Sequence, residues 1–319
     1  MMLRLDTSDF FEHPAAGMNS RERLTALGQW LALGTLVGVV SGAASAAFLW
    51  LLDRATEWRT GHEVIVYALP VAGLTLGWIA EQFGQEIKAG NNLVIDTIHD
   101  DGPEIPLRMA PLVLLGTVLT HLFGGSAGRE GAAVQMAASR TDWLSHRLRL
   151  GRSVRRQLLA ASVAGGFGSV FGTPVAGAVF GLEFVVRGRI EYHALVPALV
   201  ASVVGDLTTC GLGIVHTPYP AVREVPLTPL FFVGATLGNV LARPLGIPLE
   251  LGAAVGLAAL FAAAANTPLA LSIMAVELFG AAVLPHVLIV CVVAYVLSGH
   301  ASIYPAQRLF RNDDIARPE

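Results

Sequence analysis

The chain has 319 residues, of which 54% are hydrophobic and 14% are charged, and its mean hydropathy is +0.60. Because soluble domains carry about 25% charged residues, this composition excludes an ordinary soluble enzyme and predicts an integral membrane protein. The net charge of −3 says little, since the charged residues gather between the apolar runs.

The first 20 residues are polar and mixed, without the apolar core of a cleavable signal, and we expect them to form a cytoplasmic segment. Residues 24–52 are apolar and long enough to cross a bilayer with tilt. Within them Gly34, Gly38 and Gly42 recur every four residues, which predicts a helix-packing face. Residues 53–63 are then expected to form a short charged loop.

Further apolar runs follow along the chain. The expected spans are 64–79, 106–123, 158–168, 175–186, 193–207, 230–241, 249–265 and 281–297. The stretch 140–156 is the most basic, so the positive-inside rule puts it in the cytoplasm, and Arg21 and Arg23 put the N-terminus there too. A nucleic-acid patch is the alternative, but no aromatic interleaving or binding module accompanies these arginines. The sequence therefore predicts a multi-pass protein with no nucleic-acid partner.

Four glycines lie within residues 124–131, between an apolar run and a helix-compatible run. They let the backbone turn its N–H groups inward where a helix begins, and such a helix N-terminus is a ready anion site. Glu130 puts a carboxylate of the protein at the same spot. A carboxylate and a free anion that need the same place compete for it, so this stretch indicates a gate.

Other short apolar segments begin with Gly, Pro or Thr breaks rather than charged flanks, at residues 168–174, 227–229 and 266–268. Broken helices at membrane depth are tolerated where they line a cavity or are buried in protein, and in transporters they mark the substrate site. No Walker lysine follows the glycine-rich stretch, and no His or Cys pair has metal-ligand spacing in a polar context. We therefore expect no enzyme, no cofactor and no metal, with Cys210 and Cys291 as buried small hydrophobes without a disulfide.

The Gly-Arg-Glu-Gly sequence at 128–131 resembles the gating-glutamate motif of the CLC chloride channels and anion/proton antiporters. The Phe-Gly-Thr-Pro-Val-Ala-Gly sequence at 171–177, with Glu183 nine residues after the proline, is similar to the helix pair that follows in that family. The resemblance implies an all-α, polytopic membrane fold, an inverted-repeat bundle whose broken helices meet at the midplane. It also implies a homodimer with one pore per subunit, placed in the lipid bilayer of the bacterial inner membrane.

Several details resemble one branch of that family, the fluoride/proton antiporters. The Gly-Asn-Asn-Leu sequence at 90–93 stands where most of the family carries Gly-Ser-Gly-Ile-Pro. The Leu-Thr-Pro-Leu-Phe-Phe sequence at 227–232 is similar to a late broken helix of the branch, and Tyr304 fits a C-terminal tyrosine that faces the anion. The internal proton glutamate of the family would fall at Phe184, and its absence also suits this branch.

The resemblance implies that ionised Glu130 occupies the anion site and that protonated Glu130 swings out, so that a fluoride ion enters and a proton moves the other way. A small, strongly hydrated anion needs compact donors that offset its dehydration. The candidates for anion binding are Asn91, Asn92, Gly128, Arg129, Gly131, Thr228 and Tyr304, and candidates for a supporting role are Glu183, Gly172 and Thr173.

Structural interpretations of the same residues stay open. Asn91, Asn92 and Thr228 could cap helices, and Tyr304 could be an interfacial aromatic. Glu130 could merely complement the helix dipole, Arg129 could form an ion pair or a cap, and Glu183 could make a buried hydrogen bond.

The chain departs from the family pattern between residues 216–220 and 228–229, where only residues 221–227 stand in place of several helices. The expected organisation is a cytoplasmic segment at 1–20, a first helical repeat at 21–220 and a shortened second repeat at 221–319. Two alternatives to fluoride export are a chloride channel or chloride/proton exchanger of the same family, and a truncated membrane protein that does not transport.

Overall fold

The computed structural model describes residues 19–100, 104–216, 229–299 and 301–309. These residues are helical apart from connections and one short pair of strands. The elements are α2 (Ser20–Gly61), η1 (Glu63–Ala68), α3 (Leu69–Phe83), η2 (Gln85–Ile87), α4 (Asn91–Asp100), α5 (Met109–Leu122), α6 (Arg129–Arg147), α7 (Arg152–Phe171), α8 (Pro174–Glu183), β1 (Val186–Arg187), η3 (Tyr192–Ala194), α9 (Leu195–Gly211), α10 (Pro229–Leu245), α11 (Leu249–Ala265), α12 (Pro268–Phe279), η4 (Ala281–Val283), α13 (Leu284–Ser298) and β2 (Arg308–Leu309).

Some of the helices are long enough to span a membrane and others are too short. In the described part of the chain, four helical stretches have the length and composition of a span: Ser20–Gly61, Glu63–Phe83, Tyr192–Gly211 and Ala281–Ser298. Helices α5, α8, α11 and α12 are apolar but shorter. Because short helices leave backbone groups unpaired at their ends, they need protein around those ends. The predicted all-α, polytopic membrane fold is confirmed.

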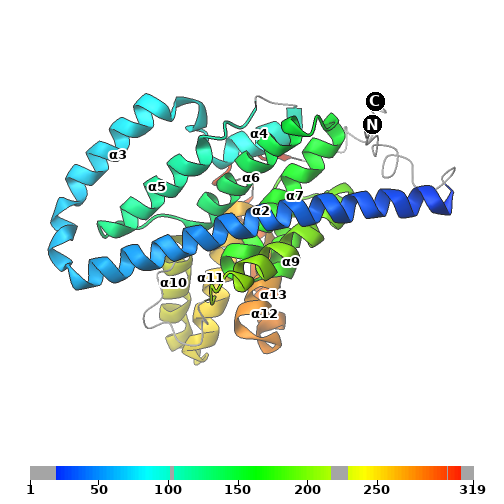
Figure 1. Cartoon of the computed structure of the whole chain (residues 1–319). Helices are drawn as coiled ribbons and strands as arrows, with labels where there is room; N and C mark the ends of the chain where they lie inside the picture. Colours follow the sequence, from blue (N-terminus) through cyan, green and yellow to red (C-terminus); the bar gives the residue numbers. More distant parts are fainter. Residues whose placement is uncertain (1–18, 101–103, 217–228, 300, 310–319) are drawn as a thin grey trace.

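Helix α2 crosses the whole molecule (Figure 1). The predicted loop at 53–63 was wrong, because the helix continues to Gly61 and therefore carries Asp53. No Gly or Pro interrupts residues 53–60, and an ion pair between Arg54 and Glu57, with 3.0 Å between Nη1 and Oε2, joins neighbouring positions on the helix surface.

The glycine stripe of α2 packs against α9, as its spacing predicts. A Cβ added at Gly34 would lie 3.2 Å from the carbonyl oxygen of Pro197, and one at Gly38 would lie 2.9 Å from that of Ala201. A Cβ at Gly42 would overlap the carbonyl of Gly205. The contacts advance together along both helices, so α2 and α9 run parallel where they pack.

Helices α7–α8 and α11–α12 break in the same way. Helix α7 continues through the glycines at 165–168, so the break is shorter than predicted and begins at Gly172, whose φ is 70°. Asn266 ends α11 with a φ of 57°. Each of these left-handed residues is followed by a Thr-Pro pair, whose proline is the first residue of the next helix. The two halves of the chain therefore repeat one helix–break–helix unit.

Two glutamates join these units reciprocally. Glu183, at the end of α8, accepts hydrogen bonds from the backbone N–H groups of Leu269 (3.3 Å) and Ala270 (2.8 Å) at the start of α12. Glu277, near the end of α12, accepts hydrogen bonds from the N–H groups of Val175 (3.0 Å) and Ala176 (2.8 Å) at the start of α8. Each carboxylate thus satisfies donors that a helix N-terminus leaves unpaired.

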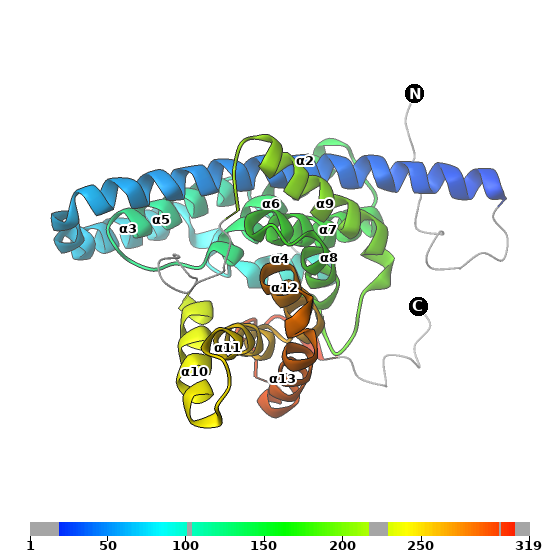
Figure 2. The same ribbon diagram turned by 90° about the horizontal axis from the view of Figure 1, so that it is seen from below.

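The second repeat has fewer helices around it than the first. Figure 2 shows α10–α13 on the side of the molecule opposite α2. Helices α9 and α13 each have a proline near their start, Pro197 and Pro285, and the two helices can be aligned on these prolines. In this alignment, the residues of α9 that contact α2 correspond to the large apolar side chains between Leu288 and Leu297 of α13. Those on α13 are exposed, Ile289 by 64% and Leu297 by 81%. In the described residues nothing covers α13 as α2 covers α9, which agrees with a shortened second repeat.

The C-terminal tail folds back into the molecule. Val186 and Arg187 of β1 pair in parallel with Arg308 and Leu309 of β2. The Gln307 amide donates to the carbonyl oxygens of Phe184 (2.9 Å) and Ala265 (2.8 Å), which lie at the ends of α8 and α11. Because Gln307 is only 4% exposed, these bonds fix the tail where the two repeats meet.

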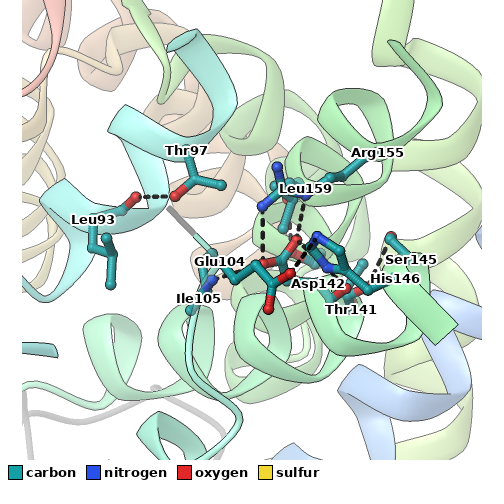
Figure 3. A network of polar contacts seen from close by, with 11 residues as sticks. Leu93, Thr97, Glu104, Ile105, Thr141, Asp142, Ser145, His146, Arg155 and Leu159 are labelled. Carbon is teal, nitrogen blue, oxygen red and sulfur yellow. Dashed lines mark hydrogen bonds and ion pairs between the residues drawn. The ribbon is translucent and has the colours of Figure 1, made fainter. Parts of the chain in front are cut away.

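A buried ion pair ties α6 to α7. Figure 3 shows Asp142 at the centre of this network. Its carboxylate accepts hydrogen bonds from Arg155 Nε (2.6 Å), Arg155 Nη2 (3.0 Å) and the N–H group of Ile105 (2.7 Å). His146 Nε2 lies 3.2 Å from Glu104 Oε1 at the rim of the network. The pair thereby holds the segment before α5 against the two helices.

Candidate anion site

The glycine-rich stretch ends where α6 begins. Gly124 has a φ of 83°, Gly128 is the N-cap, and Arg129 is the first residue of the helix. Glu130 is 6% exposed, and its Oε1 would lie 3.2 Å from a Cβ built at Gly128. The carboxylate therefore folds back over the start of its own helix, where the N–H groups and the dipole favour a negative charge.

Helix α4 begins beside α6. Gly90 has a φ of 57°, which a residue with a side chain adopts at a cost, and Asn91 follows as the first residue of α4. Asn91 is 8% exposed, and its Nδ2 would lie 3.2 Å from a Cβ built at Gly131. The absence of a side chain at Gly131 thus gives the Asn91 amide room next to the start of α6.

Tyr304 reaches the same place from the tail. Its hydroxyl accepts a long hydrogen bond of 3.5 Å from Asn91 Nδ2 and lies close enough to Glu130 for the two to interact electrostatically. Its ring packs edge-on against Phe184, with 5.0 Å between the ring centroids. Asn91 and Tyr304 therefore meet beside the start of α6, where Glu130 lies, although the three residues are far apart in the sequence.

Asn92 has a different hydrogen-bond partner from Asn91. Its Oδ1 accepts a hydrogen bond of 3.1 Å from the N–H group of Ala306, two residues after Tyr304. Asn92 thus anchors the tail to α4, and it positions Tyr304 through the backbone.

Arg129 lies on another side of the α6 start. It interacts electrostatically with Asp53 and His121. It also lines a polar cavity of about 20 Å³, room for one water molecule, together with Asp53 and His216. Arg129 therefore faces the end of α2, and the cavity brings polar side chains close to the residue next to Glu130.

The remaining predicted residues lie at the helix breaks. Glu183 bonds the start of α12, Gly172 supplies the left-handed turn, and Thr173 is the completely buried N-cap of α8. The hydroxyl of Thr173 makes no hydrogen bond, because the carboxylate of Glu277 caps this helix instead. Thr228 lies outside the described residues.

Sequence reasoning missed two residues that build this region, Glu277 and Gln307. A signal for Glu277 was present, since Thr-Pro is followed by a glutamate nine residues after the proline in both repeats. No local pattern marks Gln307, whose role depends on carbonyl groups from both repeats. The two cysteines are free as predicted, and Cys291 is buried, but Cys210 is exposed, which corrects the expectation that both are buried.

The family model described as voltage gated chloride channel matches residues 72–224 and 226–299. The chain belongs to this CLC family. A chloride/fluoride channel protein of Pseudomonas syringae pv. tomato is 37% identical over 393 aligned residues, which cover 89% of this chain and 87% of that protein.

Solved structures agree with this assignment. A crystal structure of a CLC-type fluoride/proton antiporter superposes with a TM-score of 0.83 at 28% identity, covering 92% of this chain and all of that one. A eukaryotic CLC transporter, at 18% identity and a TM-score of 0.68, shares the fold. This CLC protein is thus an anion transporter of the membrane.

The comparisons also bear on the length of the chain. The alignment with the Pseudomonas protein runs over 393 residues, more than the 319 present here, so the relative carries residues that face gaps in this chain. The family match is interrupted at residue 225, within residues 221–227, where the sequence departs from the family pattern. Both findings agree with an internally shortened member of the family.

Proposed function

We propose that this CLC protein exports fluoride in exchange for inward-moving protons, with Glu130 as the gate. The observation that carries the proposal is the meeting of Glu130, Asn91 and Tyr304 at the start of α6. When ionised, the Glu130 carboxylate occupies the position that the helix N-terminus offers to an anion. When protonated, it loses that electrostatic advantage and leaves the position to fluoride.

The hydrogen-bond donors of this site suit a small anion. Asn91 Nδ2 and the Tyr304 hydroxyl are compact donors on buried side chains, and their mutual bond of 3.5 Å is long enough to yield to an ion. Burial makes such donors strong, because few water molecules compete with the anion for them. The names of the Pseudomonas relative and of the antiporter structure, both of which mention fluoride, favour the same substrate.

Gly128 and Gly131 leave room for the Glu130 and Asn91 side chains to move. A methyl group at Gly128 would press on the Glu130 carboxylate, and one at Gly131 would press on the Asn91 amide. Both positions therefore have to stay small if the carboxylate and the anion exchange places here. Gly128, Gly131 and Tyr304 thus belong to the proposed site, with Asn92 and Arg129 beside it and Thr228 as a further candidate.

The proposal extends to orientation and assembly. The basic stretch at 140–156 favours a cytoplasmic N-terminus, and the family resemblance favours a homodimer in a bacterial inner membrane. The gaps in the alignment favour a second candidate, a shortened membrane protein that folds without transporting.

Efflux from proteoliposomes loaded with fluoride or with chloride distinguishes these candidates. We expect rapid fluoride release and little chloride release from the wild type. In Glu130→Gln, fluoride release should no longer be coupled to proton uptake. Glu250→Gln is the matched control, because Glu250 also lies in the first turn of a helix but is exposed. Release of chloride as fast as fluoride would assign a chloride transporter, and release of neither would support the non-transporting protein.

A further inference from the structure

Three side chains of metal-ligand type meet at the end of α9. Asp206 and Cys210 lie one helical turn apart, and His216 follows in the connection after the helix. His216 Nε2 lies 3.0 Å from Asp206 Oδ1, and Cys210 Sγ lies 3.9 Å from the same oxygen. Among the residues that the structure describes, this is the one group of three or more such side chains whose ligand atoms lie within 4.8 Å of one another.

The spacing suits a tetrahedral divalent cation. Bonds of about 2.0 Å to nitrogen and oxygen and 2.3 Å to sulfur put the ligand atoms roughly 3.2–3.6 Å apart. Closing the three atoms on a cation therefore needs shifts of about 1 Å or less, which side-chain rotation supplies. His216 Nε2 is buried and makes no hydrogen bond of good geometry with the nearby carboxylate. The ring nitrogen and the carboxylate oxygen are therefore close enough to bind one cation.

The backbone behind His216 limits where its ring can go. A Cβ added at Gly172 would lie 2.6 Å from Cδ2 of the ring, so the ring packs against the break between α7 and α8. The same ring lines the small polar cavity with Asp53 and Arg129. His216 thus connects the end of α9 to the cavity that is also lined by Arg129, the residue before Glu130.

We propose that Asp206, Cys210 and His216 bind a thiophilic divalent cation of the Zn²⁺ type. On binding, the Cys210 thiol gives its proton to solvent and the thiolate, the imidazole nitrogen and a carboxylate oxygen donate to the metal, with water as the fourth ligand. The charges that face the site are Asp206 itself and Glu277, which interacts with it electrostatically, with Arg129 and Asp53 across the cavity. Asp206 places a negative charge within the site itself, as a bound cation requires.

Thiol labelling tests the site without any transport measurement. Cys210 is exposed and Cys291 is completely buried, so a maleimide added to the folded protein in detergent reports on Cys210. With Zn²⁺ at ten times its dissociation constant, labelling should slow about tenfold, because roughly one site in eleven stays empty. Protection should disappear in His216→Ala and Asp206→Asn. It should persist in His286→Ala, which removes an exposed histidine of α13.

Equal protection in wild type and His216→Ala, or none in the wild type, overturns the proposal. Elution of each variant as a single gel-filtration peak excludes misfolding as the cause. The consequence for the gate rests on the proposed function and is tested separately: Zn²⁺ should slow fluoride efflux in the wild type and not in Cys210→Ser. If Zn²⁺ protects the thiol and efflux is unchanged, the site stands and its coupling to transport is refuted.

Discussion

The reciprocal glutamates predict a measurable loss of stability when one of them is truncated. In Glu183→Ala, the backbone N–H groups of Leu269 and Ala270 lose their acceptor at a place where Ala270 and Glu183 are almost completely buried. An unsatisfied buried donor costs about 1–3 kcal/mol, and the N–H group of Ala270 should account for most of this loss, because Leu269 is 38% exposed.

Glu277→Ala removes the equivalent acceptor from Val175 and Ala176. Because Val175 is 48% exposed and Glu277 is only partly buried, other groups can approach these donors, and the loss should lie near the lower end of the same range. Glu183→Gln keeps one acceptor oxygen for the pair of N–H groups and should fall between Glu183→Ala and the wild type.

Thermal unfolding in detergent, followed by the loss of the monodisperse gel-filtration peak, measures these differences. At about 2 °C per kcal/mol for a chain of this size, Glu183→Ala should lower the midpoint by at least about 2 °C. Glu250→Ala, an exposed glutamate in the first turn of α11, should leave it unchanged. A midpoint for Glu183→Ala that equals that of Glu250→Ala would refute the claim that the two repeats cap each other.

Three further changes follow from the contacts described above. Asp142→Asn removes the negative charge facing buried Arg155 and should destabilise the protein by about 3–5 kcal/mol, measured by the same unfolding assay. Tyr304→Phe keeps the ring packing but loses the hydroxyl, so apparent fluoride affinity in efflux assays should fall up to about tenfold. The unfolding midpoint should change little, because the bond that Asn91 loses is long, at 3.5 Å, and therefore weak. Gly128→Ala presses on the Glu130 carboxylate and should slow efflux, whereas Gly116→Ala, with open space around it, should not.

Much of the fold follows from local sequence signals. Apolar runs locate the helices, and Gly34, Gly38 and Gly42 identify the face that meets α9 because small residues allow close approach. The end of α2 is not predicted correctly, because the charged residues at 53–60 suit a loop and an exposed helix surface equally well. Hydropathy alone does not distinguish a loop from a helix that extends past the apolar layer.

The candidate site was harder to predict than the helices. The Gly-Arg-Glu-Gly sequence located Glu130, because glycines before a helix start carry a local signal. The sequence does not predict the different partners of the two asparagines. Asn91 donates a hydrogen bond to the Tyr304 hydroxyl, whereas Asn92 accepts one from the N–H group of Ala306. Such choices depend on the path of the tail, which long-range contacts decide.

Simultaneous recording of fluoride and proton movement in proteoliposomes tests the gate most directly. If the Glu130 carboxylate and the anion exchange places at the start of α6, wild-type vesicles should take up protons as fluoride leaves, and this coupled uptake should vanish in Glu130→Gln. A Glu130→Gln variant that still drives protons against the leaving fluoride would contradict the account.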